Sequence, residues 1–149
     1  MNRLFAIEGH ASNWREAINL TASKLFENGC VNDEFYDKCC EREEEFPTGL
    51  TETCPVAIPH ASKEYVINQS ICVLRLDEPI KFRSMSDIDQ EVDIRYIINL
   101  ALLDDSEHIK IISQVINCLK DHSFLEKMDS LNIEDLKEYL VENFFCGLS

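Results

Sequence analysis

The sequence predicts an α/β fold in which a single mixed β-sheet of about five strands is flanked by helices on both faces. Short apolar runs of strand length alternate along the chain with segments whose apolar residues recur at helical spacing. Part of one run, within residues 92–103, is apolar on both sides, which suits the centre of a covered sheet. No stretch rich in Pro, Gly or Ser divides the 149 residues, so we expect one domain over 1–149.

The N-terminal third is expected to supply an edge strand and two helices. Leu4–Ile7 suits the strand. Ser12 can cap a first helix, which Gly29 would end. A second helix is predicted over 33–46 with Asn32 as its cap. Both helices should pack on the sheet.

Beyond residue 60 the sequence predicts strands first and helices afterwards. Four segments have strand-like patterns: 65–67, 71–76, 80–84 and 92–103. Asp77-Glu78-Pro79 suits a tight hairpin, and 92–103 is the expected central strand. Three helices should follow, one starting at Asp104-Asp105-Ser106, one over about 123–131 and one capped by Asn132. The expected inward face of the first of these comprises Ile109, Ile112, Ile116 and Leu119.

Composition narrows the class of partner and the compartment. Fourteen basic and 28 acidic residues give a net charge of −14, which argues against nucleic acid or an anionic membrane surface as a partner. Seven cysteines without a C-x-x-C pair or a secretory segment near Met1 favour a reducing cytoplasm. The longest apolar runs are too short for insertion into a bilayer.

His60 is the first candidate for chemistry. The apolar run Pro55–Ile58 suits a buried strand that Pro59 would end, because proline cannot donate a ladder hydrogen bond. His60 would then lie at the lip of the sheet, where open α/β sheets usually bind their ligands. The alternative is a half-buried polar residue that only closes the strand.

Arg42 is the second candidate. In the helix predicted over 33–46, Phe35, Cys39, Arg42 and Phe46 fall on one face, which places the arginine on the inward stripe. A buried guanidinium needs an anion, and a phosphate would meet it bidentately. The alternative is that Arg42 pairs with a carboxylate of the acidic run 41–45. That run should repel a phosphate unless its carboxylates point to solvent.

Two further segments suit an anion site. Pro47-Thr48-Gly49 breaks the chain after the helix, and its amide N–H groups and hydroxyl can cradle phosphate oxygens. His108 falls in the first turn of a predicted helix, whose dipole would lower its pKa and favour neutral imidazole. With a favourable strand order, His108 would face the same sheet edge as His60. The alternative is an exposed first-turn histidine.

Three pieces of the central sequence carry a family resemblance. They are Arg42-Glu43, then Pro47-Thr48-Gly49-Leu50, then Val56-Ala57-Ile58-Pro59-His60-Ala61. In this order and spacing they resemble the active-site region of type-2 enzyme IIA domains of the bacterial sugar phosphotransferase system, the fructose, mannitol and galactitol class. The Pro-Thr-Gly form is most similar to galactitol-type proteins.

The resemblance implies a phosphohistidine relay. His60 would accept a phosphoryl group from the phosphocarrier protein HPr and pass it to a cysteine of enzyme IIB, for uptake of a sugar or sugar alcohol by a separate membrane permease. Arg42 would clamp the phosphate, Thr48 and Gly49 would line its pocket, and His108 would orient His60 or steady the phosphate. No metal or organic cofactor is implied.

Two other interpretations stay open. A regulatory module of the nitrogen-type phosphotransferase branch would use the same His60 but bind regulatory targets instead of enzyme IIB. A metal-binding protein could use His60, His108 and Cys54, although this spacing matches no known zinc pattern.

Overall fold

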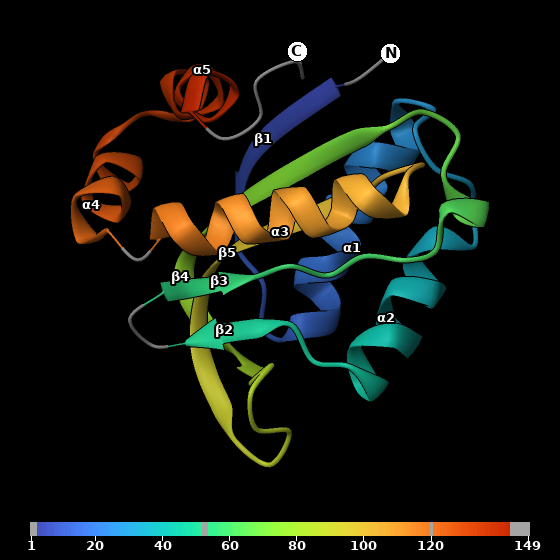
Figure 1. Ribbon diagram of the computed structural model, residues 1–149, viewed down its shortest axis with the longest axis horizontal. Helices are drawn as coiled ribbons and strands as arrows, with labels where there is room; N and C mark the ends of the chain where they lie inside the picture. The colour runs from blue at the N-terminus through green and yellow to red at the C-terminus, as the bar shows by residue number, and fades with distance from the viewer. Residues whose placement is uncertain (1–2, 52–53, 120, 144–149) are drawn as a thin grey trace.

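The computed structural model describes residues 3–51, 54–119 and 121–143 and has a five-stranded sheet at its centre (Figure 1). The strands are β1 (Arg3–Gly9), β2 (Gly49–Thr51), β3 (Cys54–Ala57), β4 (Ser70–Arg83) and β5 (Glu91–Ala101), in the order β1-β4-β5-β3-β2. The β1/β4 and β3/β5 pairs are parallel, whereas β4/β5 and β2/β3 are antiparallel. The predicted mixed sheet is therefore confirmed, and β5 is its central strand.

Helices cover both faces of this sheet, as predicted. The helices are α1 (Trp14–Glu27), α2 (Phe35–Glu45), α3 (Asp105–Leu119), α4 (His122–Ser130) and α5 (Ile133–Asn143), with a 3-10 turn, η1 (Lys63–Tyr65). One core cluster joins the sheet to α1 and α2, and a second joins its other face to α3, α4 and α5. In Figure 1, α3 crosses the near face of the sheet and α1 lies behind it.

Alternating side chains of the central strands feed these two cores. On β4, Cys72 and Leu74 point to the α1/α2 core, while Ile71 and Val73 point to the α3–α5 core. These four residues are fully buried. Burial on both faces explains why the strand reads as continuously apolar.

Local capping chemistry sets the ends of α1. The helix is capped one residue later than expected, because the Asn13 side chain accepts from the N–H of Glu16 at 3.0 Å. Glu16 in turn accepts from the N–H of Ser12 at 3.0 Å. Gly29 ends the helix at a φ of +72°, in the left-handed region that glycine adopts without a Cβ penalty.

Two expectations for the strands are wrong, and one strand was not predicted. Residues 65–67 form no strand, since η1 ends there and Val66 makes only an isolated bridge to Val31. Asp77-Glu78-Pro79 is no hairpin, because β4 runs unbroken through it with a register irregularity between Arg75 and Ile80. Proline cannot donate to the ladder, so it is tolerated in such a bulge. Strand β2 was not expected.

The expected inward face of α3 is also wrong in part. Ile111 and Val115 are buried, whereas Ile109 is 70% exposed. The side chain of Leu119 lies outside the described residues, as does Phe144, which the helical spacing predicts to lie on the inward face of the last helix. Leu136 and Leu140 of α5 are buried as the helical spacing predicts. Within the described ranges, no helix has the length and apolar character needed to span a bilayer.

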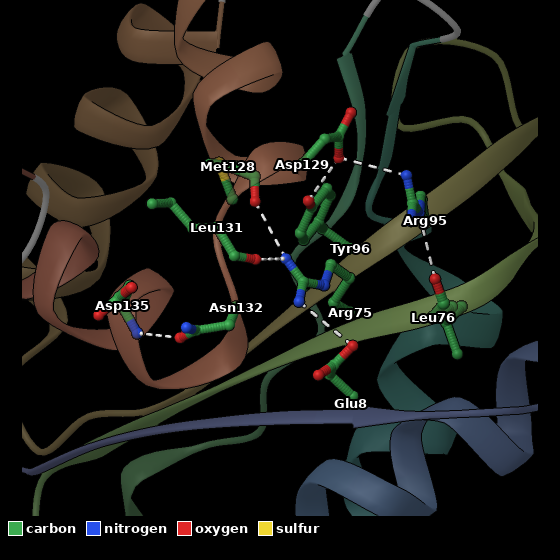
Figure 2. Close-up of polar contacts among 10 residues, drawn as sticks. All are labelled: Glu8, Arg75, Leu76, Arg95, Tyr96, Met128, Asp129, Leu131, Asn132 and Asp135. Carbon is green, nitrogen blue, oxygen red and sulfur yellow. Dashed lines mark hydrogen bonds and ion pairs between the residues drawn. The ribbon is translucent and has the colours of Figure 1, made fainter.

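A buried arginine joins the sheet to the C-terminal helices (Figure 2). Arg75 of β4 donates to the carbonyls of Met128 and Leu131, at 3.0 and 2.7 Å, and pairs with Glu8 of β1 at 3.2 Å. These carbonyls lie where α4 ends and the chain turns into α5. The guanidinium thus satisfies carbonyls that the end of a helix leaves without a donor.

Candidate active site

His60 lies just beyond the carboxyl end of β3, beside the end of the central strand. It forms an isolated parallel bridge with Leu100 of β5, whose N–H donates to the carbonyl of Pro59 at 3.1 Å. The residue is half-buried. Its predicted position at the edge of the sheet is therefore where the structure places it.

One hydrogen bond defines the tautomer of His60. Its Nδ1 is 3.0 Å from the carbonyl oxygen of Ile58. A carbonyl only accepts, so Nδ1 carries the proton and Nε2 keeps its lone pair. Burial, with smaller contributions from Arg42 and His108, lowers the pKa of His60 to about 4, against the opposing effect of the Ile58 hydrogen bond. The ring is thus neutral at pH 7, with Nε2 as its nucleophilic atom.

His108, in the first turn of α3, faces His60. The two ring centroids are 4.9 Å apart and the rings are inclined by 43°. Burial and then Arg42 lower the pKa of His108, with Asp105 opposing. Its Nε2 is shielded from solvent and has no hydrogen-bond partner among the described residues. The two histidines meet because α3 follows β5, which lies next to β3.

The structure corrects the predicted setting of Arg42. Its side chain is exposed, as is Phe46 at 60%, so neither lies on the inward stripe of α2. That stripe instead continues from Cys39 to Glu43, four residues further on. The guanidinium carbon lies 5.5 Å from the Phe46 ring centroid, and no described carboxylate is within ion-pair distance. Arg42 lines a groove of about 400 Å³ between α2 and residues 61–65.

The acidic run around Arg42 does not converge on His60. Glu41, Glu44 and Glu45 are exposed. Glu41 pairs with Lys38 at 3.1 Å, and Glu44 pairs with Arg15 of α1. Arg42 remains near enough to lower the pKa of both histidines. The positive charge of Arg42, which has no ion-pair partner among the described residues, therefore acts on both imidazole rings.

Glu43, the second residue of the Arg-Glu motif, is a buried carboxylate for which the sequence indicated no role. It is 4% exposed and accepts from the Thr48 N–H at 2.7 Å and the Thr48 hydroxyl at 2.8 Å. Burial raises its pKa to about 7, although the two bonds from Thr48, Arg83 and Arg42 act in the opposite direction. The available signal was its spacing of four residues from the apolar Cys39.

Thr48 and Gly49 are built into the scaffold of the site. Thr48 is buried, and its hydroxyl also accepts from the N–H of Ile58 at 3.1 Å. Gly49 pairs with Ala57 in the sheet, and its carbonyl accepts from Met85 at 2.7 Å. As predicted, the helix ends just before the Pro47-Thr48-Gly49 segment. The phosphate-binding role predicted for the two residues stays a prediction.

The structure thus brings His60, His108 and Arg42 together at one end of the sheet, and Thr48 is hydrogen-bonded to Ile58, which in turn bonds His60. Cys54 is not part of this group. It starts β3, and the six extended residues to His60 span roughly 20 Å. In the described part of the chain, no three His, Cys, Asp or Glu residues could together hold a metal ion.

Comparison with known proteins identifies the family. The family model described as phosphoenolpyruvate-dependent sugar phosphotransferase system, EIIA 2, matches residues 2–143. The mannitol-specific EIICBA component of Vibrio cholerae is 32% identical over 124 residues, which are 81% of this chain and 18% of that protein. The galactitol-specific EIIA component of Escherichia coli strain K12 is 26% identical over 128 residues, 85% of each chain.

Solved structures share the fold over nearly the full length. The crystal structure of the mannitol IIA of Escherichia coli has a TM-score of 0.74 and 26% identity, covering 93% of this chain and 95% of that one. The mannitol IIA in complex with phosphorylated enzyme IIB, also from Escherichia coli, has a TM-score of 0.68 and 25% identity. The match covers 95% of this chain and 93% of that one. Since the family model spans nearly the whole sequence, this chain belongs to the EIIA 2 family of the phosphoenolpyruvate-dependent sugar phosphotransferase system, as a phosphotransfer component.

Proposed function

We propose that His60 accepts a phosphoryl group from the phosphocarrier HPr and passes it to a cysteine of an enzyme IIB, for uptake of a sugar or sugar alcohol of the mannitol and galactitol class. The observation that carries the proposal is the bond from His60 Nδ1 to the Ile58 carbonyl, which leaves Nε2 as a neutral nucleophile. The names of the relatives supply the substrate class, and the solved complex of a related IIA with phosphorylated IIB supplies the acceptor.

The chemistry needs little beyond alignment. The Nε2 lone pair of His60 attacks the phosphorus of phosphorylated HPr, a P–N bond to His60 forms, and the P–N bond in HPr breaks. The proton stays on Nδ1, which continues to donate to the Ile58 carbonyl, so no proton has to move within His60. In the second step an IIB thiolate attacks the same phosphorus and the imidazole leaves with its electron pair. Positioning and charge stabilisation are sufficient for such transfers, and no metal or organic cofactor is called for.

The neighbouring residues take distinct roles in this proposal. Arg42 is the clamp: its positively charged guanidinium lines the groove and can meet phosphoryl oxygens as they approach. His108 orients His60 or steadies the phosphoryl group from 4.9 Å away. Thr48 and Gly49 support the wall of the site. The expected setting is the cytoplasm, with a membrane permease as the further partner.

Intact-mass measurement tests the proposal. The protein is incubated with phosphoenolpyruvate, enzyme I and HPr, in parallel with His60→Ala and with His122→Ala, an exposed histidine of α4. We expect one acid-labile phosphoryl adduct on the wild type and on His122→Ala, and none on His60→Ala. Absence of an adduct on folded wild-type protein would refute the relay.

The second half-reaction separates the transport and regulatory interpretations. The phosphorylated protein is mixed with mannitol-type and galactitol-type IIB domains, and loss of the adduct is followed. Transfer to an IIB cysteine is the expected result. An adduct that neither IIB can remove would instead favour the nitrogen-type regulatory module.

A further inference from the structure

Glu43 stands where a carboxylate is costly in two respects. It lies in the last turn of α2, where the negative end of the helix dipole disfavours an acid. It is also 4% exposed, whereas the flanking Glu44 and Glu45 are exposed. Burial and the helix dipole both disfavour the charged form of Glu43, so this carboxylate adds little to the stability of the fold. Its hydrogen bonds therefore indicate another role.

Those contacts fix the direction of a hydroxyl. A threonine hydroxyl has one proton, and that of Thr48 is donated to Glu43 at 2.8 Å. The lone pairs of the same oxygen are then free to accept the N–H of Ile58 at 3.1 Å. The second oxygen of Glu43 accepts the Thr48 N–H at 2.7 Å and so holds the residue on both sides.

The Ile58 residue continues the connection to His60. Ile58 is fully buried, and its carbonyl accepts from His60 Nδ1 at 3.0 Å. Its N–H and its carbonyl are thereby both engaged, one by Thr48 and one by His60. A continuous series of hydrogen bonds runs from Glu43 on α2 to the reacting imidazole.

We infer that Glu43 is a positioning residue, which acts through Thr48 and Ile58 to hold His60 in the Nδ1–H tautomer with Nε2 presented to the phosphoryl group. The inference rests on the function proposed for His60. Glu43 itself touches neither the imidazole nor, being buried, a partner protein.

The first test replaces the carboxylate by its amide. In Glu43→Gln the side chain presents one acceptor in place of two, so the Thr48 N–H and hydroxyl cannot both be satisfied. We expect kcat for phosphorylation by HPr to fall ~10- to 100-fold, the effect of a misplaced reacting group, with KM for HPr unchanged. The matched control is Glu34→Gln, an exposed glutamate at the start of the same helix that makes no capping bond. Its kcat should stay within about twofold of wild type.

A second readout does not depend on activity. Nitrogen-15 NMR of the imidazole distinguishes the two neutral tautomers of His60. The wild type should show only the Nδ1–H form, and Glu43→Gln should show a mixture. The spectra are recorded at pH 8, above the raised pKa of Glu43, where the carboxylate is ionised.

Thr48 variants test whether the effect passes along this route. Thr48→Val should reproduce the loss of kcat, Thr48→Ser should retain most of the activity, and Glu43→Gln combined with Thr48→Val should be no slower than Thr48→Val alone. If Glu43→Gln fails to fold, the His60 tautomer decides: Thr48→Val should show a mixture and Thr48→Ser only the Nδ1–H form, and a single tautomer in Thr48→Val would overturn the inference.

Wild-type kcat and a single tautomer in folded Glu43→Gln would overturn the inference, as would wild-type kcat in Thr48→Val. A wild-type protein that HPr does not phosphorylate would instead refute the proposed function. The tautomer measurement would still decide the role of Glu43.

Discussion

The imidazole of His60 owes its chemical state to neighbours that differ in kind. A backbone carbonyl two residues earlier holds the proton on Nδ1, and burial keeps the ring from gaining a second one. Arg42 and His108 act in the same direction as burial. A neutral, oriented imidazole therefore does not depend on a catalytic carboxylate in direct contact with it.

An NMR titration of the histidine rings should find His60 titrating near pH 4. His10, whose pKa is raised from its ordinary value by its hydrogen bond to Asp77, should shift in the opposite direction and serve as the internal control. Because the folded-state pKa of His60 lies below the unfolded value of about 6.5, the folded state binds fewer protons between these two values. His60 thus contributes stability above pH 6.5 that is lost as the pH falls towards 4. Titration of His60 at 6.5 or higher would contradict this account of its burial.

Arg42 should matter for transfer and little for folding. Its side chain is exposed, so Arg42→Ala should change the free energy of unfolding by less than about 0.5 kcal/mol. Phosphoryl transfer should slow ~100-fold, as when one charge-stabilising donor is removed. Arg15→Ala, which removes an exposed arginine paired with Glu44, is the matched control. A rate within twofold of wild type would exclude Arg42 as the clamp.

Among the elements, α2 and β2 differ most from what their sequences indicate. The apolar positions of α2 fit two inward faces, one through Arg42 and one through Glu43. Packing chooses the second, because Cys39 contacts Asn99 of β5 and Glu43 reaches Thr48. Strand β2 has three residues, too few for a periodic pattern, and pairing with β3 defines it.

Gly49 in β2 should not tolerate a side chain. A Cβ there would lie 2.7 Å from the backbone oxygen of Arg83 and 2.9 Å from Val92 Cγ2. Gly49→Ala should therefore destabilise the fold by about 2 kcal/mol in urea unfolding, since the backbone of β4 cannot move aside cheaply. At Gly9 a Cβ would meet only side-chain atoms, at 3.4 and 3.5 Å, so Gly9→Ala is the control and should be nearly neutral. Equal effects of the two substitutions would contradict the close approach.

At the scale of the whole molecule, polar contacts complement the two cores. Arg75 connects β4 and β1 to the end of α4, and Tyr96 of β5 donates to Asp129 at 2.6 Å (Figure 2). Arg95 also reaches Asp129, at 3.3 Å. The C-terminal helices are thus held to the sheet by hydrogen bonds as well as by apolar packing.

Arg75→Met should loosen α4 and α5 before the rest of the fold. It leaves two carbonyls near the end of α4 without their donor, and we expect a loss of about 3 kcal/mol with early hydrogen exchange in these helices. Arg95→Met is the control: its side chain is 37% exposed, so the substitution should lower the free energy of unfolding clearly less than Arg75→Met does. Uniform loss of exchange protection across the sheet would contradict this assignment.

Local sequence signals were sufficient to predict much of the fold and part of the candidate site. The alternation of helices and strands, the apolar run of the central strand and the capping residue Asn132 correctly indicated the layered fold. Asn32 was the wrong cap for α2, which begins at Phe35 with Glu34 as its N-cap. The proline-bounded run before His60 placed that residue at the end of a strand. The Arg-Glu, Pro-Thr-Gly and Ala-Ile-Pro-His pieces indicated the family that the comparison then identified.

The sequence by itself determined the layers, the central strand and the position of His60 at the end of a strand, because these depend on periodicity, capping and short motifs. Only the tertiary structure decided that His108 meets His60, that α2 turns Glu43 inward and leaves Arg42 exposed, and that Asp77-Glu78-Pro79 is a bulge within β4. The physical reason is that each of these depends on contacts between residues far apart in the chain, whose free energies decide between patterns that are locally equivalent.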